Sequence, residues 1–235
     1  MERLTDVTIE GISYHAKGND SLLLSPMGCR AWLAETSGIF DLCHQRRIWA
    51  LAAALKYDQR VESVILGVTN VLVVLREIPL NETDILEWLK QLWNASQATP
   101  IAGKEIIIPV TYGGEMATDL EDVCRHTGLS DREVVRRHYQ GRYTVCAVGS
   151  APGFGYLHGL DPALATPRKT VPSLNMLKGT VTIGGPQTGV SVLTGPNGWN
   201  AIGYADVEFF DPYRVPPALM VPGDTLRFVP EKIEL

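Results

Sequence analysis

The chain has 235 residues, and its 21 basic and 26 acidic residues leave a net charge of −5. This acidic balance argues against nucleic acid as a partner, because such binding needs a basic surface. Hydrophobic residues make up 45% of the chain, which is typical of a globular protein of one or two domains. The N-terminal segment has no signal-peptide pattern and the apolar run at 48–55 is too short to span a bilayer, so we expect a cytoplasmic protein without membrane contact.

The cysteines and histidines show no metal-binding pattern. Cys29, Cys43, Cys124 and Cys146 have no CxxC spacing and are expected to be reduced core residues. HExxH is absent, so no metal site is predicted. The sequence also lacks a P-loop and the GxSxG motif of α/β-hydrolases.

The first hundred residues alternate between strand and helix patterns. Within 82–96, Ile85, Leu86 and Leu89 recur at helical spacing, whereas the VLVVLR segment is rich in β-branched residues. The predicted elements are a strand at 30–35, a helix at 41–57, strands at 61–66 and 71–76, a helix at 82–96 and a strand at 104–110. This β-α-β-β-α-β order is typical of a ferredoxin-like sandwich.

Two short helices are predicted within 118–140. Capping boxes begin at Thr118 and Ser130, and Gly128 and Gly141 are placed to end the helices. The pair resembles a helix-turn-helix with arginines that could meet phosphate, but the acidic chain favours a solvated connector.

The composition changes after residue 150, where 11 of the 15 prolines lie. Short apolar strands separated by glycine or proline are typical of a β-barrel. The predicted strands are 143–149, 180–184, 189–193, 206–210 and 226–230. We therefore predict a ferredoxin-like α/β domain at 1–103 and a β-barrel domain at 104–235 with a two-helix insert at 118–140.

The stretch from Gly149 to Arg168 has neither a helical period nor strand alternation, and we interpret it as the wall of a pocket. The charged residues between Tyr143 and Asn200 sum to +2, which suits an anionic or carbonyl-bearing small molecule. The alternative is a barrel core that simply excludes charge. The Arg168 guanidinium is a candidate clamp for a carboxylate or phosphate, or else a surface partner of Asp161.

The glycine-rich segment 183–189 has two interpretations. It is either a turn between strands or a cradle of backbone amides for an oxyanion, with Gln187 and Thr188 as further donors. The second interpretation predicts that the segments near 152–168 and 184–188 together form the rim of a cup. That rim would hold a ligand through main-chain nitrogens and one guanidinium.

Several segments together resemble one known family. They are QRRIWALAAAL, TNVLVVLRE, IPVTYGG, DLEDVCRHTGLSDREVVRRH, APGFGYLHGLD, ATPR, IGGPQTGV, GWNAIGYADVEFFDP and LMVPGDTLRFVP. The chain is identified on these motifs as similar to the family of 5-oxoprolinase B subunits, also called the KipI or allophanate hydrolase subunit 1 family. The resemblance implies an N-terminal α/β domain, a cyclophilin-like β-barrel, and partner subunits C and A.

The resemblance also implies an activity and a site. Such subunits together hydrolyse 5-oxo-L-proline to L-glutamate with ATP and Mg²⁺ at the level of the complex; no tightly bound cofactor is expected. The predicted catalytic residues are Arg168 and Gln187, around developing oxyanions, and His158, as an acid–base group. The predicted substrate-binding residues are Pro152, Gly153, Phe154, Tyr156, Gly185, Thr188, Trp199, Tyr112 and His138.

The sequence departs from the family pattern near the presumed pocket. Ser173 stands where an arginine is usual, Lys178 where an alanine is usual, and Gly155 replaces a proline. Tyr204 lies in a further altered motif, so the substrate stays open. The alternative function is a KipI-like protein that binds a sensor histidine kinase.

Overall fold

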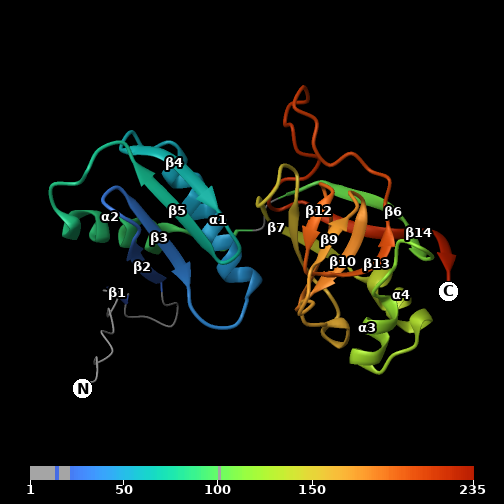
Figure 1. Cartoon of the computed structure of the whole chain (residues 1–235). Coiled ribbons are helices and arrows are strands. Elements are labelled where there is room, and N and C mark those ends of the chain that lie inside the picture. The colour runs from blue at the N-terminus through green and yellow to red at the C-terminus, as the bar shows by residue number, and fades with distance from the viewer. Residues whose placement is uncertain (1–13, 16–21, 100–101) are drawn as a thin grey trace, which may run out of the picture. The chain divides into compact units, whose positions relative to one another are not determined.

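The structure is a computed structural model that describes residues 14–15, 22–99 and 102–235. The chain divides into two compact units, Met1–Thr99 and Pro100–Leu235, each with its own hydrophobic core (Figure 1). Each unit is described by itself below.

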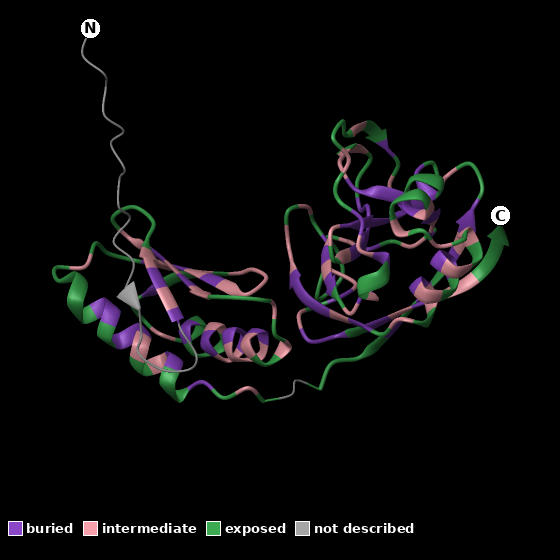
Figure 2. Ribbon diagram, turned by 90° about the horizontal axis from the view of Figure 1, so that it is seen from below, coloured by how far each residue is buried: buried purple, intermediate pink, exposed green. Residues whose placement is uncertain are grey.

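The first unit is an antiparallel sheet with two helices. Its strands are β1 (Tyr14–His15), β2 (Leu22–Pro26), β3 (Ala31–Thr36), β4 (Val61–Leu66) and β5 (Asn70–Leu75), in the sheet order β1-β2-β3-β5-β4. Its helices are α1 (Leu42–Lys56) and α2 (Glu82–Ala95), whose first turns are capped by the side chains of Asp41 and Asn81. Figure 2 shows both helices on the same side of the sheet, and each carries buried residues along its length.

This topology does not confirm the ferredoxin-like prediction. The predicted last strand of that order, 104–110, corresponds to β6 (Glu105–Gly113), which pairs within the second unit and not with the first sheet. The sheet instead gains β2, which the sequence pattern did not predict and which pairs with β3. Intermediate and buried residues alternate along β5, as expected for a strand with one face in the core, and it lies where β-branched residues predicted a strand.

The second unit contains a closed β-barrel. Among the described residues its seven strands follow the order β10-β11-β8-β7-β14-β6-β13, and β13 pairs with β10 to close the ring. Their bounds, after β6, are β7 (Tyr143–Val148), β8 (Gly155–His158), β10 (Thr180–Gly184), β11 (Gln187–Val190), β13 (Asn200–Tyr204) and β14 (Thr225–Glu234). A separate two-stranded ribbon joins β9 (Ser173–Met176) to β12 (Gly195–Asn197).

The barrel depends on contacts between distant parts of the chain. Strands β6 and β14 pair in parallel over nearly their whole length although more than a hundred residues separate them. The predicted strand at 206–210 is wrong: only Phe210 forms an isolated bridge, to Ala218, within that segment. Phe209 is nevertheless fully buried in the barrel core, which explains the apolar pattern that suggested a strand.

The two-helix insert consists of α3 (Leu120–Thr127) and α4 (Asp131–Gln140). The predicted capping box at Thr118 is wrong, because Asp119 is the N-cap and its carboxylate makes no capping bond. Gly128 ends α3 in the left-handed conformation with φ of 72°, as predicted. Ser130 caps α4 by accepting a hydrogen bond from the Glu133 amide, as predicted.

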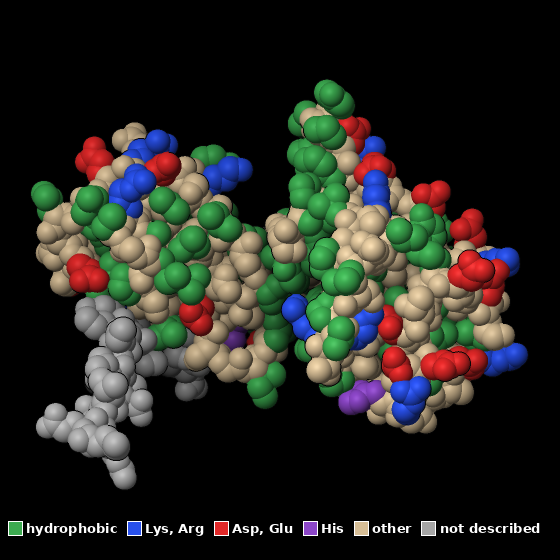
Figure 3. Space-filling model, viewed as in Figure 1, with side chains coloured by type: hydrophobic (Ala, Val, Ile, Leu, Met, Phe, Trp, Pro, Cys, Tyr) green, Lys and Arg blue, Asp and Glu red, His purple; other side chains and the backbone are tan. Residues whose placement is uncertain are grey.

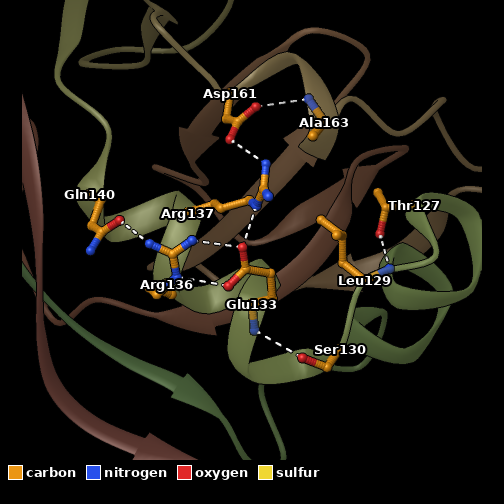
Figure 4. A network of polar contacts seen from close by, with 9 residues as sticks. All are labelled: Thr127, Leu129, Ser130, Glu133, Arg136, Arg137, Gln140, Asp161 and Ala163. Carbon is orange, nitrogen blue, oxygen red and sulfur yellow. Dashed lines mark hydrogen bonds and ion pairs between the residues drawn. The ribbon is translucent and has the colours of Figure 1, made fainter.

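Glu133 is the centre of a network of ion pairs on α4 (Figure 4). Glu133 accepts hydrogen bonds from Arg136 and Arg137, and Arg137 also pairs with Asp161. Figure 3 shows acidic and basic side chains side by side over α3 and α4. This pairing supports the connector interpretation of the insert. Among the described helices, none is both long and apolar enough to cross a membrane.

Candidate functional site

The second unit has a pocket of about 530 Å³ beside the β9–β12 ribbon. It is formed by the turn before β8 together with β8, by Arg168, and by the segment that follows β11. The lining residues are Ser150, Ala151, Phe154, Tyr156, Arg168 and the continuous stretch 191–199. The predicted wall 149–168 therefore contributes to this pocket, and so does the stretch 191–199, in which Trp199 was the residue predicted to bind substrate.

Aromatic rings form one wall of the pocket. Phe154 packs edge-on against Tyr156 at 5.0 Å and against Trp199 at 5.9 Å between ring centroids. Gly184 makes room for this cluster, because a Cβ atom there would lie 2.4 Å from the Trp199 ring. The wall is thus a rigid apolar surface set by ring-to-ring and ring-to-backbone contacts.

Among the described residues that line the pocket, Arg168 alone has a charged side chain. Its guanidinium carbon lies 5.7 Å from the Trp199 ring centroid, within the range of a cation–π contact. The alternative that Arg168 pairs with Asp161 is wrong, because Asp161 pairs with Arg137. No ion pair to Arg168 is formed within the described part of the chain, so the pocket has one uncompensated positive charge.

The segment after β11 contributes neutral polar groups to the pocket lining. Asn197 donates from Nδ2 to Oγ of Ser191 at 3.0 Å and accepts from the Trp199 amide at 2.9 Å. This segment reads TGPNG at 194–198, and its glycine, proline and asparagine are turn signals that could have marked it as a loop at the pocket.

Three residues predicted to bind substrate lie in the barrel core. Tyr112, His138 and Thr188 are each fully buried and are absent from the described pocket lining. The Tyr112 hydroxyl donates to Nδ1 of His138 at 2.7 Å. The Thr188 hydroxyl donates its proton to the Thr182 carbonyl. Nε2 of His138 must therefore be the donor in its 2.8 Å contact with Oγ1 of Thr188.

This chain of hydrogen bonds requires a neutral imidazole with its proton on Nε2. Complete burial lowers the pKa of His138 to about 3, which keeps the ring neutral near pH 7. Since both ring nitrogens already have partners, the geometry assigns His138 to stabilising the barrel interior. Its substrate-binding role stays a prediction that the pocket does not support.

The 183–189 segment forms a hairpin turn between β10 and β11. The Gly185 amide donates to the Thr166 carbonyl at 2.7 Å, so this amide is already used within the protein. The segments 152–168 and 184–188 therefore do lie side by side, as predicted. Gly185, Gln187 and Thr188 are nevertheless outside the described pocket lining, and 191–199 takes the place of the second rim segment.

The remaining predicted residues also lie outside the lining. Pro152 and His158 are exposed. Gly153 is buried with φ of 82°, and a Cβ atom there would lie 2.5 Å from the Phe209 carbonyl, so its glycine is needed for close packing. Lys178, which stands where the family usually has an alanine, pairs with Glu208 and is outside the described lining.

One cation, an aromatic wall and neutral polar groups suit a small anionic molecule with a flat apolar face. The same donor set does not fit Mg²⁺ with ATP, because the lining has no carboxylate and one guanidinium. Within the described residues, no three His, Cys, Asp or Glu side chains are arranged to hold a metal ion.

The sequence matches a known protein family. The profile of the carboxyltransferase domain, subdomains C and D, matches residues 22–220. The chain belongs to this carboxyltransferase-domain family, within the group of the 5-oxoprolinase B subunits.

Two curated relatives place it within that family. A protein of Escherichia coli O157:H7, named as the B subunit of 5-oxoprolinase, is 44% identical over 88% of this chain and 94% of its own length. A protein of the same name from Haemophilus influenzae is 38% identical over 81% of this chain and 89% of its own length.

Solved structures share the fold. TTHA0988 superposes with a TM-score of 0.73 at 31% identity, covering 86% of this chain and 40% of that longer chain. PH0987 from Pyrococcus horikoshii has a TM-score of 0.54 at 33% identity, covering 89% of this chain and 97% of its own. The urea carboxylase of Kluyveromyces lactis, at 18% identity and a TM-score of 0.75, shows likeness of fold over 93% of this chain and 22% of its own.

Proposed function

We propose that this chain is the B subunit of an ATP-dependent 5-oxoprolinase, which hydrolyses 5-oxo-L-proline to L-glutamate together with subunits C and A. The observation that carries this proposal is the 44% identity to the Escherichia coli protein of that name over 94% of its length. The KipI-like alternative is not favoured, because the curated relatives at 38–44% identity are named as oxoprolinase subunits.

The pocket at Arg168 is the proposed site for the acidic substrate. The guanidinium would bind the carboxylate through its planar fork, and the ring of 5-oxoproline would lie against the Phe154–Trp199 wall. Asn197, a lining residue whose Nδ2 group also donates to Ser191, would offer a neutral hydrogen-bonding group to the lactam. This assignment uses the observed lining residues in place of Gln187 and His158, whose predicted catalytic roles the pocket does not support.

The hydrolysis of a lactam requires activation, because amide resonance makes its nitrogen a poor leaving group. ATP supplies that activation in the proposed complex by phosphorylating the lactam oxygen. The lining of this pocket does not fit Mg²⁺ with ATP, so subunits C and A would supply the nucleotide site. This chain's own part is to neutralise the substrate carboxylate, orient its ring and keep water from its apolar face.

The test is ATP hydrolysis by the complex of this chain with subunits C and A from the same source. We expect ADP release that depends on 5-oxo-L-proline and on the presence of this chain. Arg168→Ala should raise KM for 5-oxoproline by roughly tenfold to a hundredfold, as expected for loss of a hydrogen-bonded charge. Arg142→Ala removes an exposed guanidinium outside the pocket lining and serves as the control.

ADP release by the complete mixture that ignores 5-oxoproline would contradict the proposed activity. Equal KM values for Arg168→Ala and Arg142→Ala would leave the activity standing but remove the substrate from this pocket. Binding of the isolated chain to a histidine kinase without nucleotide would favour the KipI-like alternative.

A further inference from the structure

Arg168 lies between two residues whose backbones are each tied to the barrel. Its side chain is exposed at the pocket, and an exposed arginine ordinarily samples many rotamers. The contacts of Pro167 and Lys169 fix the backbone position from which the Arg168 side chain reaches the Trp199 ring.

The carbonyl of Pro167 is held from the barrel interior. Asn200, which is 4% exposed, donates from Nδ2 to the Pro167 carbonyl at 2.9 Å and to the Ile183 carbonyl at 3.0 Å. One buried amide group thus joins the segment before Arg168 to strand β10. One residue earlier, the Thr166 carbonyl accepts from the Gly185 amide.

Lys169 is held by both its backbone and its side chain. Its amide donates to the carbonyl of Gly198, a lining residue of the pocket, at 2.7 Å. Its ammonium pairs with Asp119 at 2.8 Å and also donates to Oγ of Ser173. The side chains of this ion pair are only 14% and 11% exposed, so the pair is shielded from solvent.

Asp119 is in turn tied to the strand that carries Asn200. Its Oδ2 accepts from the Ala201 amide at 2.8 Å, and its own amide donates to the Ala201 carbonyl at 3.1 Å. Both anchors of the Arg168 segment therefore end on consecutive residues of β13. This explains why Asp119 makes no capping bond to α3: its carboxylate is used on Lys169 and Ala201.

We propose that Asn200 and the Lys169–Asp119 ion pair are positioning residues that fix Arg168 over Trp199 for recognition of the substrate carboxylate. This inference rests on the proposed function, since it assigns the residues that orient the carboxylate-binding group. Lys169 and Asp119 are outside the described pocket lining, so they act through Arg168 and not on the ligand. With its backbone fixed on both sides and its guanidinium over Trp199, Arg168 is preorganised to bind a carboxylate.

The test is a double-mutant cycle in the complex with subunits C and A, measured as KM and kcat for 5-oxoproline. Lys169→Met removes the ammonium and keeps a chain of similar length. We expect KM to rise about tenfold with kcat changed less than about twofold, since a misplaced binding group weakens substrate capture. Lys169→Arg should restore most of the loss, and Lys178→Met, which breaks an exposed ion pair, should change neither parameter.

In the Arg168→Ala background, Lys169→Met should have no further effect on KM, because the residue through which it acts is gone. Circular dichroism of each complex shows whether the variant chain is folded. If Lys169→Met does not fold, Asn200→Ala replaces it in a second cycle, for which we expect the same result. Additive effects on KM in both cycles would overturn the positioning role. If the wild-type complex shows no ATP hydrolysis that depends on 5-oxoproline, the proposed function is contradicted instead.

Discussion

The hydroxyl oxygen of Tyr112 lies 2.7 Å from Nδ1 of His138 inside the barrel, where both side chains are fully buried. The link joins strand β6 to helix α4, and Thr188 extends it to β11. A polar chain of this kind stabilises a core only while every member has its partner.

Tyr112→Phe should therefore lower the free energy of unfolding by about 1–3 kcal/mol, because it leaves Nδ1 of His138 buried without a partner. Urea denaturation of the full chain measures this. Tyr213→Phe removes a hydroxyl from a side chain that is 95% exposed, and should stay within about 0.5 kcal/mol of wild type. Equal losses in the two variants would show that the buried link contributes nothing.

Stability should fall as the pH falls from about 6.5 toward 3. Burial lowers the pKa of His138 from 6.5 to about 3, so within this window the unfolded state binds a proton that the folded state rejects. The stabilisation that comes from a neutral His138 is complete above pH 6.5. The free energy of unfolding at pH 4.5 should be lower than at pH 7 by roughly 3 kcal/mol. His138→Gln has no titrating group, and its urea midpoint should vary less over the same range; an unchanged pH slope would disprove the assignment.

Gly184→Ala should disturb the pocket through Trp199. The added methyl would lie 2.4 Å from the ring, so the indole must move, at an expected loss of about 1–3 kcal/mol in stability. KM for 5-oxoproline in the complex should rise with it. Gly149→Ala is the matched control, since an added Cβ there meets nothing within 4 Å. If both variants behave alike in KM and in thermal melting, Trp199 does not depend on this glycine.

Gln45→Leu should destabilise the first unit by about 2 kcal/mol or more. Gln45 is fully buried, accepts from the Thr69 amide at 2.6 Å and donates to the Gly67 carbonyl at 3.2 Å, so leucine would leave both backbone groups without this partner. Gln59→Leu, on an exposed side chain, should change the urea midpoint little. A Gln45→Leu midpoint equal to that of wild type would contradict this account.

Local patterns predicted the elements whose residues repeat regularly. The helices at 42–56 and 82–95 and the strands at 61–66 and 70–75 follow from apolar spacing and β-branched residues. Strands β8, β9 and β13 were not predicted, because glycine and polar residues interrupt the alternation of apolar and polar residues along them. GYLH in β8 and NAIGY in β13 are examples. Their pairing is determined by neighbours in the barrel and not by their own propensity.

The sequence by itself determined the family, the barrel and the place of Phe154, Tyr156 and Arg168 at a pocket, because motifs and turn residues are local features. Only the tertiary structure decided which chemistry each polar residue performs. Asp119, which the local pattern placed at a helix start, instead anchors Lys169, which lies fifty residues away, and His138 lies in a sealed core. The closure of the barrel brings distant segments within hydrogen-bonding distance and so determines these partners. The spacing of residues along the chain does not show which segments meet.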